Sequence, residues 1–244
     1  MVVYILNPDY EVVGMIDEAE SILWRKKYND IGEAEIYLPC DSAYIELLQR
    51  GYMLYRYDDD MLCKIETREI ETDIEDGDYL LVTAKDICNL LSGRIIRWQI
   101  VYSGTVAGFI EKVLRDNVIS PAQSQRAIAN FTIDTTNFAE LTETISVTAV
   151  TDDLLLLIIS TCKQANYGFR VSLDINTHQL TFRLFKGQNK ATMQSDEYVE
   201  FSPDFANILS SKYKEDDSNY KNIAYVGYET VDEAFEILHL QTER

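Results

Sequence analysis

The sequence predicts a mainly β protein with a few helices. Between Glu33 and Leu38, apolar residues alternate with Glu and Tyr, which is the period-two pattern of a half-buried strand. Short runs of this kind are separated by turn residues such as Asn7-Pro8-Asp9 and Asp76-Gly77. Only two long stretches, near residues 103–117 and 152–166, have the apolar pattern of helices. Strands connected by tight turns therefore dominate the expected fold.

The length of the chain predicts two domains. It has 244 residues, of which 46% are hydrophobic. Cores commonly split above roughly 150 residues, because one core stops growing efficiently with chain length. The change from strand-like to helix-containing patterns near residue 100 is the expected boundary.

Before that boundary, two helical signals interrupt the strands. Asp41 is a plausible N-cap for a short helix with Tyr44, Leu47 and Leu48 on one face, and Gly51 follows its end. A second helical segment is expected over residues 86–91. The strands predicted in this part are residues 2–6, 11–16, 22–28, 33–38, 52–57, 62–74 and 79–84.

Beyond residue 100, two longer helices are expected. The first, Ser103 to Asn117, carries apolar residues at helical spacing and should pack one face on a core. The second is capped by Asp152 or Asp153 and is apolar on nearly every side, so it should be largely buried. A helix is also expected over residues 230–240. The strands predicted in this part are residues 127–133, 143–150, 169–173, 179–185, 198–201 and 222–227.

The charge of the chain argues against ordinary nucleic-acid binding. It has 22 Lys and Arg against 41 Asp and Glu, a formal net charge of −19. So few cations cannot release counterions from a phosphate backbone over an extended surface. An acidic surface can keep a protein soluble, attract basic partners, or repel DNA that passes nearby. The sequence leaves these three uses open.

The cysteines and the apolar runs indicate a chain made in a reducing cytosol. Cys40, Cys63, Cys88 and Cys162 are widely spaced, without the pairing of metal or redox motifs, and are expected to be buried free thiols. The N-terminus lacks the pattern of a signal peptide. The longest apolar run, residues 154–159, is far shorter than the roughly 20 residues of a membrane-spanning helix, so no membrane insertion is expected.

The sequence offers little for catalysis. His178 and His239 are the only histidines, and the common phosphate-binding, nucleophile-elbow and zinc-protease motifs are absent. Asp58-Asp59-Asp60 lacks the alternating ligands, Gly and distal Glu of a calcium loop, so a solvated turn is expected. Acidic residues are so abundant that no pair can be singled out for glycoside hydrolysis. We therefore expect no enzyme, and the sequence assigns no catalytic, cofactor-binding or metal-binding residue.

Several motifs carry a family resemblance, and they occur in a consistent order over residues 1–228. Trp24 and Tyr28 precede Gly32 to Pro39, which resembles the opening of siphophage-type tail proteins of Gram-positive prophages, where a Trp strand precedes a G-x-F-x-L-x-L-P-like strand. Later segments resemble further landmarks of the same family. They are Asp78 to Thr83, Leu90-Leu91, Arg94 to Ile96, Phe201 to Ile208 and Tyr220 to Val226.

This family is similar to baseplate hub proteins and to the N-terminal part of tail-associated proteins. The resemblance implies two small antiparallel β-barrel domains in a ring, usually a homotrimer, at the tail tip. The first barrel would be discontinuous, made of residues 1–98 and about 205–228. The second would span residues 99–204 and contain both long helices. Residues 229–244 form an unmatched C-terminal tail.

The resemblance also implies a function and partners. The chain would be a structural subunit of the virion tail, without cofactors, that contacts tail-tube, distal-tail and fibre proteins while DNA passes through the ring without specific binding. Two alternatives remain. One is a carbohydrate- or receptor-binding module at the tail tip, which would need exposed aromatic residues grouped on one face. The other is a cell-wall hydrolase.

Overall fold

The fold is that of a mainly β protein with a few helices, as the sequence predicts. The structure is a computed structural model, and it describes residues 2–73, 77–188, 190, 198–208, 210–218, 223–229 and 235–241, the last two segments by their backbone alone. The chain divides into two compact units, Met1–Gln188 and Asn189–Arg244. Each unit is described by itself.

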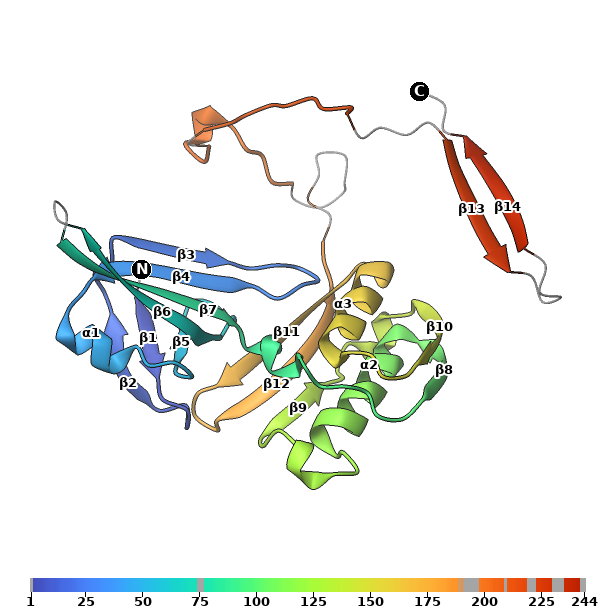
Figure 1. The fold of residues 1–244 in the computed structure, drawn as a ribbon, viewed down its shortest axis with the longest axis horizontal. Coiled ribbons are helices and arrows are strands. Elements are labelled where there is room, and N and C mark those ends of the chain that lie inside the picture. Colours follow the sequence, from blue (N-terminus) through green and yellow to red (C-terminus); the bar gives the residue numbers. More distant parts are fainter. Residues whose placement is uncertain are drawn as a thin grey trace. The chain divides into compact units, whose positions relative to one another are not determined.

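A seven-stranded antiparallel sheet forms the first part of unit 1 (Figure 1). Its strands follow the order β2-β1-β5-β6-β7-β4-β3, so β2 and β3 are the two end strands and no pairing between described residues closes the sheet. The hairpin expected around Asn7-Pro8-Asp9 is confirmed as β1 and β2. The strands are β1 Val3–Leu6, β2 Val12–Ile16, β3 Ser21–Arg25, β4 Glu33–Pro39, β5 Met53–Tyr55, β6 Cys63–Asp73 and β7 Gly77–Asp86.

One face of this sheet is a hydrophobic core built by period-two alternation. On β4, Ala34, Ile36 and Leu38 are buried, while the residues between them remain partly exposed. Helix α1, Ser42–Leu47, packs on the same core, and the Asp41 carboxylate accepts the Ala43 N–H at 2.7 Å. The expected N-cap is therefore confirmed, and it orients the helix over the buried face.

The second part of unit 1 has its own core, in which α2 and α3 contact one another and α3 lies against β11 (Figure 1). The sheet here has the order β11-β12-β9, with β12 and β9 parallel, and β8 pairs with β10. The elements are η1 Ile87–Leu91, β8 Ile100–Thr105, α2 Val106–Leu114, η2 Arg115–Ile119, η3 Ser124–Arg126, β9 Phe131–Asp134, η4 Phe138–Glu140, β10 Thr144–Ala149, α3 Leu154–Ala165, β11 Tyr167–Asp174 and β12 Gln179–Lys186.

The two long helices confirm the expectation, with two corrections. The first helix begins at Val106 instead of Ser103, because residues 100–105 pair with β10 and Thr105 caps the helix. Asp153 caps α3, as expected. Leu156, however, is 65% exposed, so α3 buries only part of its surface. An all-apolar run cannot reveal which side meets the core, since that depends on the neighbouring elements.

Unit 2 contains η5 Pro203–Phe205 and the antiparallel hairpin of β13 Ile223–Glu229 and β14 Phe235–Gln241. The strand expected at residues 198–201 is wrong, because this stretch joins no sheet in the described part of the chain. The helix expected at 230–240 is wrong over residues 235–240, where Phe235 pairs with Glu229; residues 230–234 lie outside the described residues. Short apolar runs fit helix and strand equally, and the pairing partner decides between them.

Candidate functional site: the core junction and the outer sheet face

Tyr28, which lies in the loop after β3, links the first sheet to the second part of unit 1. Its hydroxyl donates to the Asn166 carbonyl at 2.9 Å and accepts the Gly187 N–H at 2.6 Å. A Cβ atom on Gly168 would lie 2.5 Å from both the Tyr28 and the Phe185 rings, so only glycine fits there. This close contact joins the first sheet to the β11–β12 hairpin.

Ion pairs surround this contact. Asp60 lies between the Lys26 ammonium at 2.6 Å and the Arg170 guanidinium at 2.8 Å, and Lys163 pairs with Asp30 at 2.8 Å. Burial tends to raise the pKa of Asp60, but the bonds from Lys26 and Arg170 outweigh it and hold that pKa below its usual range. The junction therefore combines aromatic packing with paired charge.

The acidic triplet Asp58-Asp59-Asp60 belongs to this junction. It lies in a turn, as expected, and Asp58 is exposed beside Arg56, whose hydrogen bond lowers the Asp58 pKa. The expected solvated turn does not hold for Asp59, whose side chain is only 12% exposed and accepts the Met61 N–H. Its partner Lys26 is distant in sequence, so local reasoning could not find this role.

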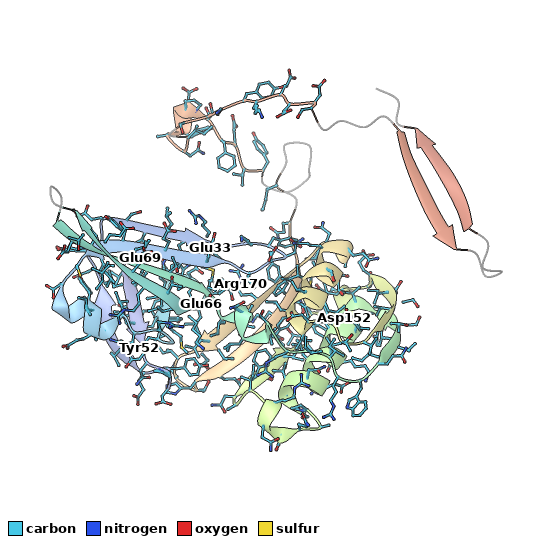
Figure 2. All side chains as sticks on the ribbon, in the orientation of Figure 1. Glu33, Tyr52, Glu66, Glu69, Asp152 and Arg170 are labelled. Atoms are coloured by element: carbon cyan, nitrogen blue, oxygen red, sulfur yellow. The ribbon has the colours of Figure 1, made fainter. Side chains whose placement is uncertain are left out.

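Asp86 and Arg170 are two buried polar residues of unit 1. Asp86 is 4% exposed, caps η1 by accepting the Cys88 N–H at 2.9 Å, and has its pKa raised by burial. Arg170 is 7% exposed, and its Nε has no hydrogen-bond partner among the residues that the structure describes. Figure 2 labels Arg170 where β11 approaches the first sheet.

The surface of the first sheet opposite its core is acidic; we call it the outer face. It forms because the residues that alternate with the buried ones on β3, β4, β7 and β6 point away from the core. Glu33, Glu66 and Glu69, labelled in Figure 2, belong to it. The outer face consists of Leu23, Arg25, Glu33, Glu35, Tyr37, Lys64, Glu66, Thr67, Glu69, Glu71, Tyr79, Leu81, Thr83 and Lys85.

Only part of this negative charge is neutralised locally. Glu33 pairs with Arg25 at 3.3 Å and Glu66 with Lys85 at 3.1 Å. The other three glutamates of the outer face form no ion pair within the described part of the chain. They are Glu35, Glu69 and Glu71. The sequence carries the signal for this face as the alternation of glutamates in residues 33–37 and 69–71, but alternation alone does not show that the two strands share one face.

The aromatic residues of the first sheet form two separate groups. Tyr37 and Tyr79 stack at 4.7 Å on the outer face. Tyr57, which is 60% exposed, contacts Tyr4 and Tyr55 edge-on. Tyr4 and Tyr55 are cross-strand partners on β1 and β5, whereas Tyr37 and Tyr79 lie on β4 and β7. The single grouped aromatic surface that a carbohydrate-binding module would need is therefore not seen on this sheet.

The cysteines are free thiols, as expected, and three of the four are buried. Cys63, Cys88 and Cys162 are buried, whereas Cys40 is half-buried. Burial raises the pKa of all three buried thiols, that of Cys162 to about 12. These groups stay protonated at neutral pH, which makes them poor nucleophiles.

The two histidines lie in different units of the chain. His178 lies in the β11–β12 turn with φ of 54° and contacts Tyr10, while His239 lies on β14. No group of three or more His, Cys, Asp or Glu side chains with metal-binding geometry occurs in the part of the chain that the structure describes.

Every helix among the described residues is too short or too polar to cross a lipid bilayer.

The sequence matches one protein family over nearly its whole length. The family model described as "Siphovirus ReqiPepy6 Gp37-like protein" matches residues 2–240. The expectation that the C-terminal tail is unmatched is therefore wrong over residues 229–240. Comparison with curated proteins gives no match.

Several solved structures are similar at low sequence identity. Prophage tail protein gp18 from Listeria monocytogenes EGD-e is 12% identical, with a TM-score of 0.49, over 99% of this chain and 67% of that chain. The tail protein from Neisseria meningitidis MC58 is 12% identical, with a TM-score of 0.43, over 74% of this chain and 49% of that one. The E. coli c3393 protein, a component of the type VI secretion system with structural similarity to T4 tail proteins gp27 and gp5, is 15% identical, with a TM-score of 0.42, over 69% of this chain.

The chain spans 46% of the length of the E. coli protein. Likeness at these TM-scores carries no argument about function. The match to the family model over residues 2–240 is a separate comparison and does not depend on these solved structures.

Proposed function

Because the chain belongs to the Siphovirus ReqiPepy6 Gp37-like family, we propose that it is a structural subunit of the tail tip, a hub protein that forms a ring continuing the tail tube. The family assignment confirms the resemblance to siphophage-type tail proteins seen in the sequence. The ring, its trimeric state and its contacts with tail-tube, distal-tail and fibre proteins are parts of the proposal.

The observation that carries the proposal is the outer face of the first sheet. Glu35, Glu69 and Glu71 lie there on adjacent strands without ion-pair partners among the described residues. Like charges held on a rigid sheet repel a polyanion, and a chain with a net charge of −19 adds to that repulsion. A ring lined by this face would let DNA slide through without binding.

The domain division of the hub is also part of this proposal. Two hydrophobic cores, one within residues 3–84 and the other mainly within 87–184, support a boundary near residue 98. We propose that both parts complete small β-barrels in the assembled protein, and that residues 205–228 return to the first. Within unit 2, β13 pairs with β14. In this role the chain has no catalytic function and belongs to the virion tail.

The mass of the protein in solution tests the proposal. Measured by light scattering over a concentration series, it should reach three times the 28.1 kDa of one chain, and electron microscopy should show rings with a central channel. A strict monomer at every concentration would contradict a ring that assembles by itself. Peptidoglycan hydrolysis that a single Asp or Glu substitution abolishes would overturn the non-catalytic role.

A further inference from the structure

A cleft lies at one corner of the outer face, where β6 approaches η1. Its volume is about 660 Å³, within the range of ligand-binding clefts. Arg50, Lys64 and Asn89 line it together with Leu90, and the buried Asp86 forms part of its floor. The cleft therefore combines two basic side chains, an amide and apolar groups with the carboxylates of Glu66 and Asp86.

Lys64 has an unusual neighbour. It lies directly opposite Lys85 in the β6–β7 ladder, and both side chains belong to the same face. Like charges that face each other across two strands destabilise a sheet, unless a third group compensates them. Glu66 compensates Lys85, at 3.1 Å, but Lys64 forms no ion pair with any residue that the structure describes.

The carboxylate of Glu66, which also lines the cleft, already binds two donors. The Glu66 carboxylate receives the Asn89 amide at 2.5 Å as well as the Lys85 ammonium. Arg50 donates its Nε to the Glu66 carbonyl at 3.0 Å, and among the described residues its two terminal nitrogens have no acceptor. Two cations thus present unused donors to one cleft.

The surroundings indicate which anion fits. Leu90 adds apolar surface that a phosphate chain cannot use. A carboxylate carried on an apolar side chain fits both the basic and the apolar lining. It accepts hydrogen bonds from Arg50 and Lys64, and its apolar part packs on Leu90. This combination is the chemistry of an acidic peptide.

We propose that the cleft between β6 and η1 binds an acidic peptide segment of a partner protein, with Arg50 and Lys64 holding its carboxylates. This interaction goes beyond the proposed ring, because it gives the subunit a docking site for a second polypeptide. It holds whether or not the chain forms a trimer.

Fluorescence anisotropy with the full chain tests the proposal. The probe is a labelled peptide of alternating Leu and Glu, compared with the matched Leu-Gln and Leu-Lys peptides. The Leu-Glu peptide should bind at concentrations up to about 1 mM, and the double variant Arg50→Gln/Lys64→Gln should weaken that binding by about tenfold. The charge-reversed variant Arg50→Glu/Lys64→Glu should prefer the Leu-Lys peptide.

Arg68→Gln is the matched control, because Arg68 lies on the same strand but does not line the cleft. It should change the affinity by less than about twofold. Circular dichroism should show that all variants keep the fold. The proposal is overturned if the Leu-Glu peptide does not bind, if the Leu-Gln peptide binds equally well, if the double variant binds as the parent does, or if inorganic phosphate displaces the peptide at equal concentration.

Discussion

Nη1 of Arg170 lies 2.8 Å from Oδ1 of Asp60, an ion pair that links β11 of the second core to the loop after β5 of the first sheet. The Arg170 side chain is 9% exposed, while that of Asp60 is 53% exposed and also binds Lys26. Water screens a buried cation less than a surface one, but burial also costs the cation its hydration, so the weight of the pair is measured by what its removal costs.

Replacing Arg170 with Ala should lower the free energy of unfolding by about 2 kcal/mol, because it removes a buried charged hydrogen bond and leaves a void. Urea unfolding measures the change. The control is Arg183→Ala, which removes a pair with Asp134 at 3.5 Å. The Arg183 side chain is 57% exposed, so the loss should be less than about 0.5 kcal/mol. Equal losses of unfolding free energy in the two variants would show that the Asp60–Arg170 pair stabilises the protein no more than a surface pair.

Gly168→Ala should destabilise the protein by about 1–3 kcal/mol, because its methyl group would meet the rings of Tyr28 and Phe185 at 2.5 Å. At Gly187 the nearest atom, also of Tyr28, is 3.1 Å from an added Cβ. Thermal melting should therefore show a smaller loss for Gly187→Ala. The reverse order would contradict the packing described for the junction.

Asp86→Asn should change how stability depends on pH. Burial raises the Asp86 pKa above its unfolded value of about 3.9, so its contribution is fully present below about pH 4 and is lost as pH rises through the folded pKa. The Asn side chain keeps an acceptor for the Cys88 N–H but does not ionise. Urea unfolding from about pH 4 to 7 should show the variant gaining stability relative to the parent as pH rises.

Asp134→Asn should change the pH dependence of stability in the opposite direction. Hydrogen bonds from Thr136 lower the Asp134 pKa, so its contribution is present above the unfolded pKa and is lost as pH falls through the folded one. Its variant should therefore lose stability relative to the parent as pH rises from about 2 to 5. If the unfolding free energies of Asp86→Asn and the parent change with pH in parallel, the raised pKa of Asp86 is contradicted.

Reversing the charge of Glu35, Glu69 and Glu71 to Lys should create non-specific DNA binding, because three cations then lie together on the outer face. Binding should appear at about 50 mM salt and be lost by about 200 mM. A control with the same charge change at the scattered, exposed residues Glu20, Glu46 and Glu140 should bind far less. If both triple variants bind DNA equally, net charge alone explains the repulsion.

A thiol reagent should modify Cys40 alone in the folded protein and all four cysteines after denaturation. Cys63, Cys88 and Cys162 are buried, and burial raises their pKa, so they offer little thiolate at neutral pH. Absorbance of the released chromophore counts the thiols. Rapid modification of a second cysteine in the folded state would contradict this burial.

Local patterns were sufficient for most of the first sheet. The hairpin of residues 2–16, the alternation over 33–38 and the Asp41 cap were all predicted and are confirmed. They depend on neighbouring residues, which is where period-two burial, turn chemistry and capping act. The strand expected at 198–201 and the helix expected at 230–240 failed, because a partner strand decides such segments.

The sequence by itself determined the mainly β fold, the acidic charge and the family to which the chain belongs, since composition, local periodicity and motif order do not depend on distant contacts. Only the tertiary structure placed Asp60 between Lys26 and Arg170, and Lys64 opposite Lys85 beside a cleft. Asp60 and Arg170 are 110 residues apart in the chain, and register and packing, not local sequence, bring such groups together.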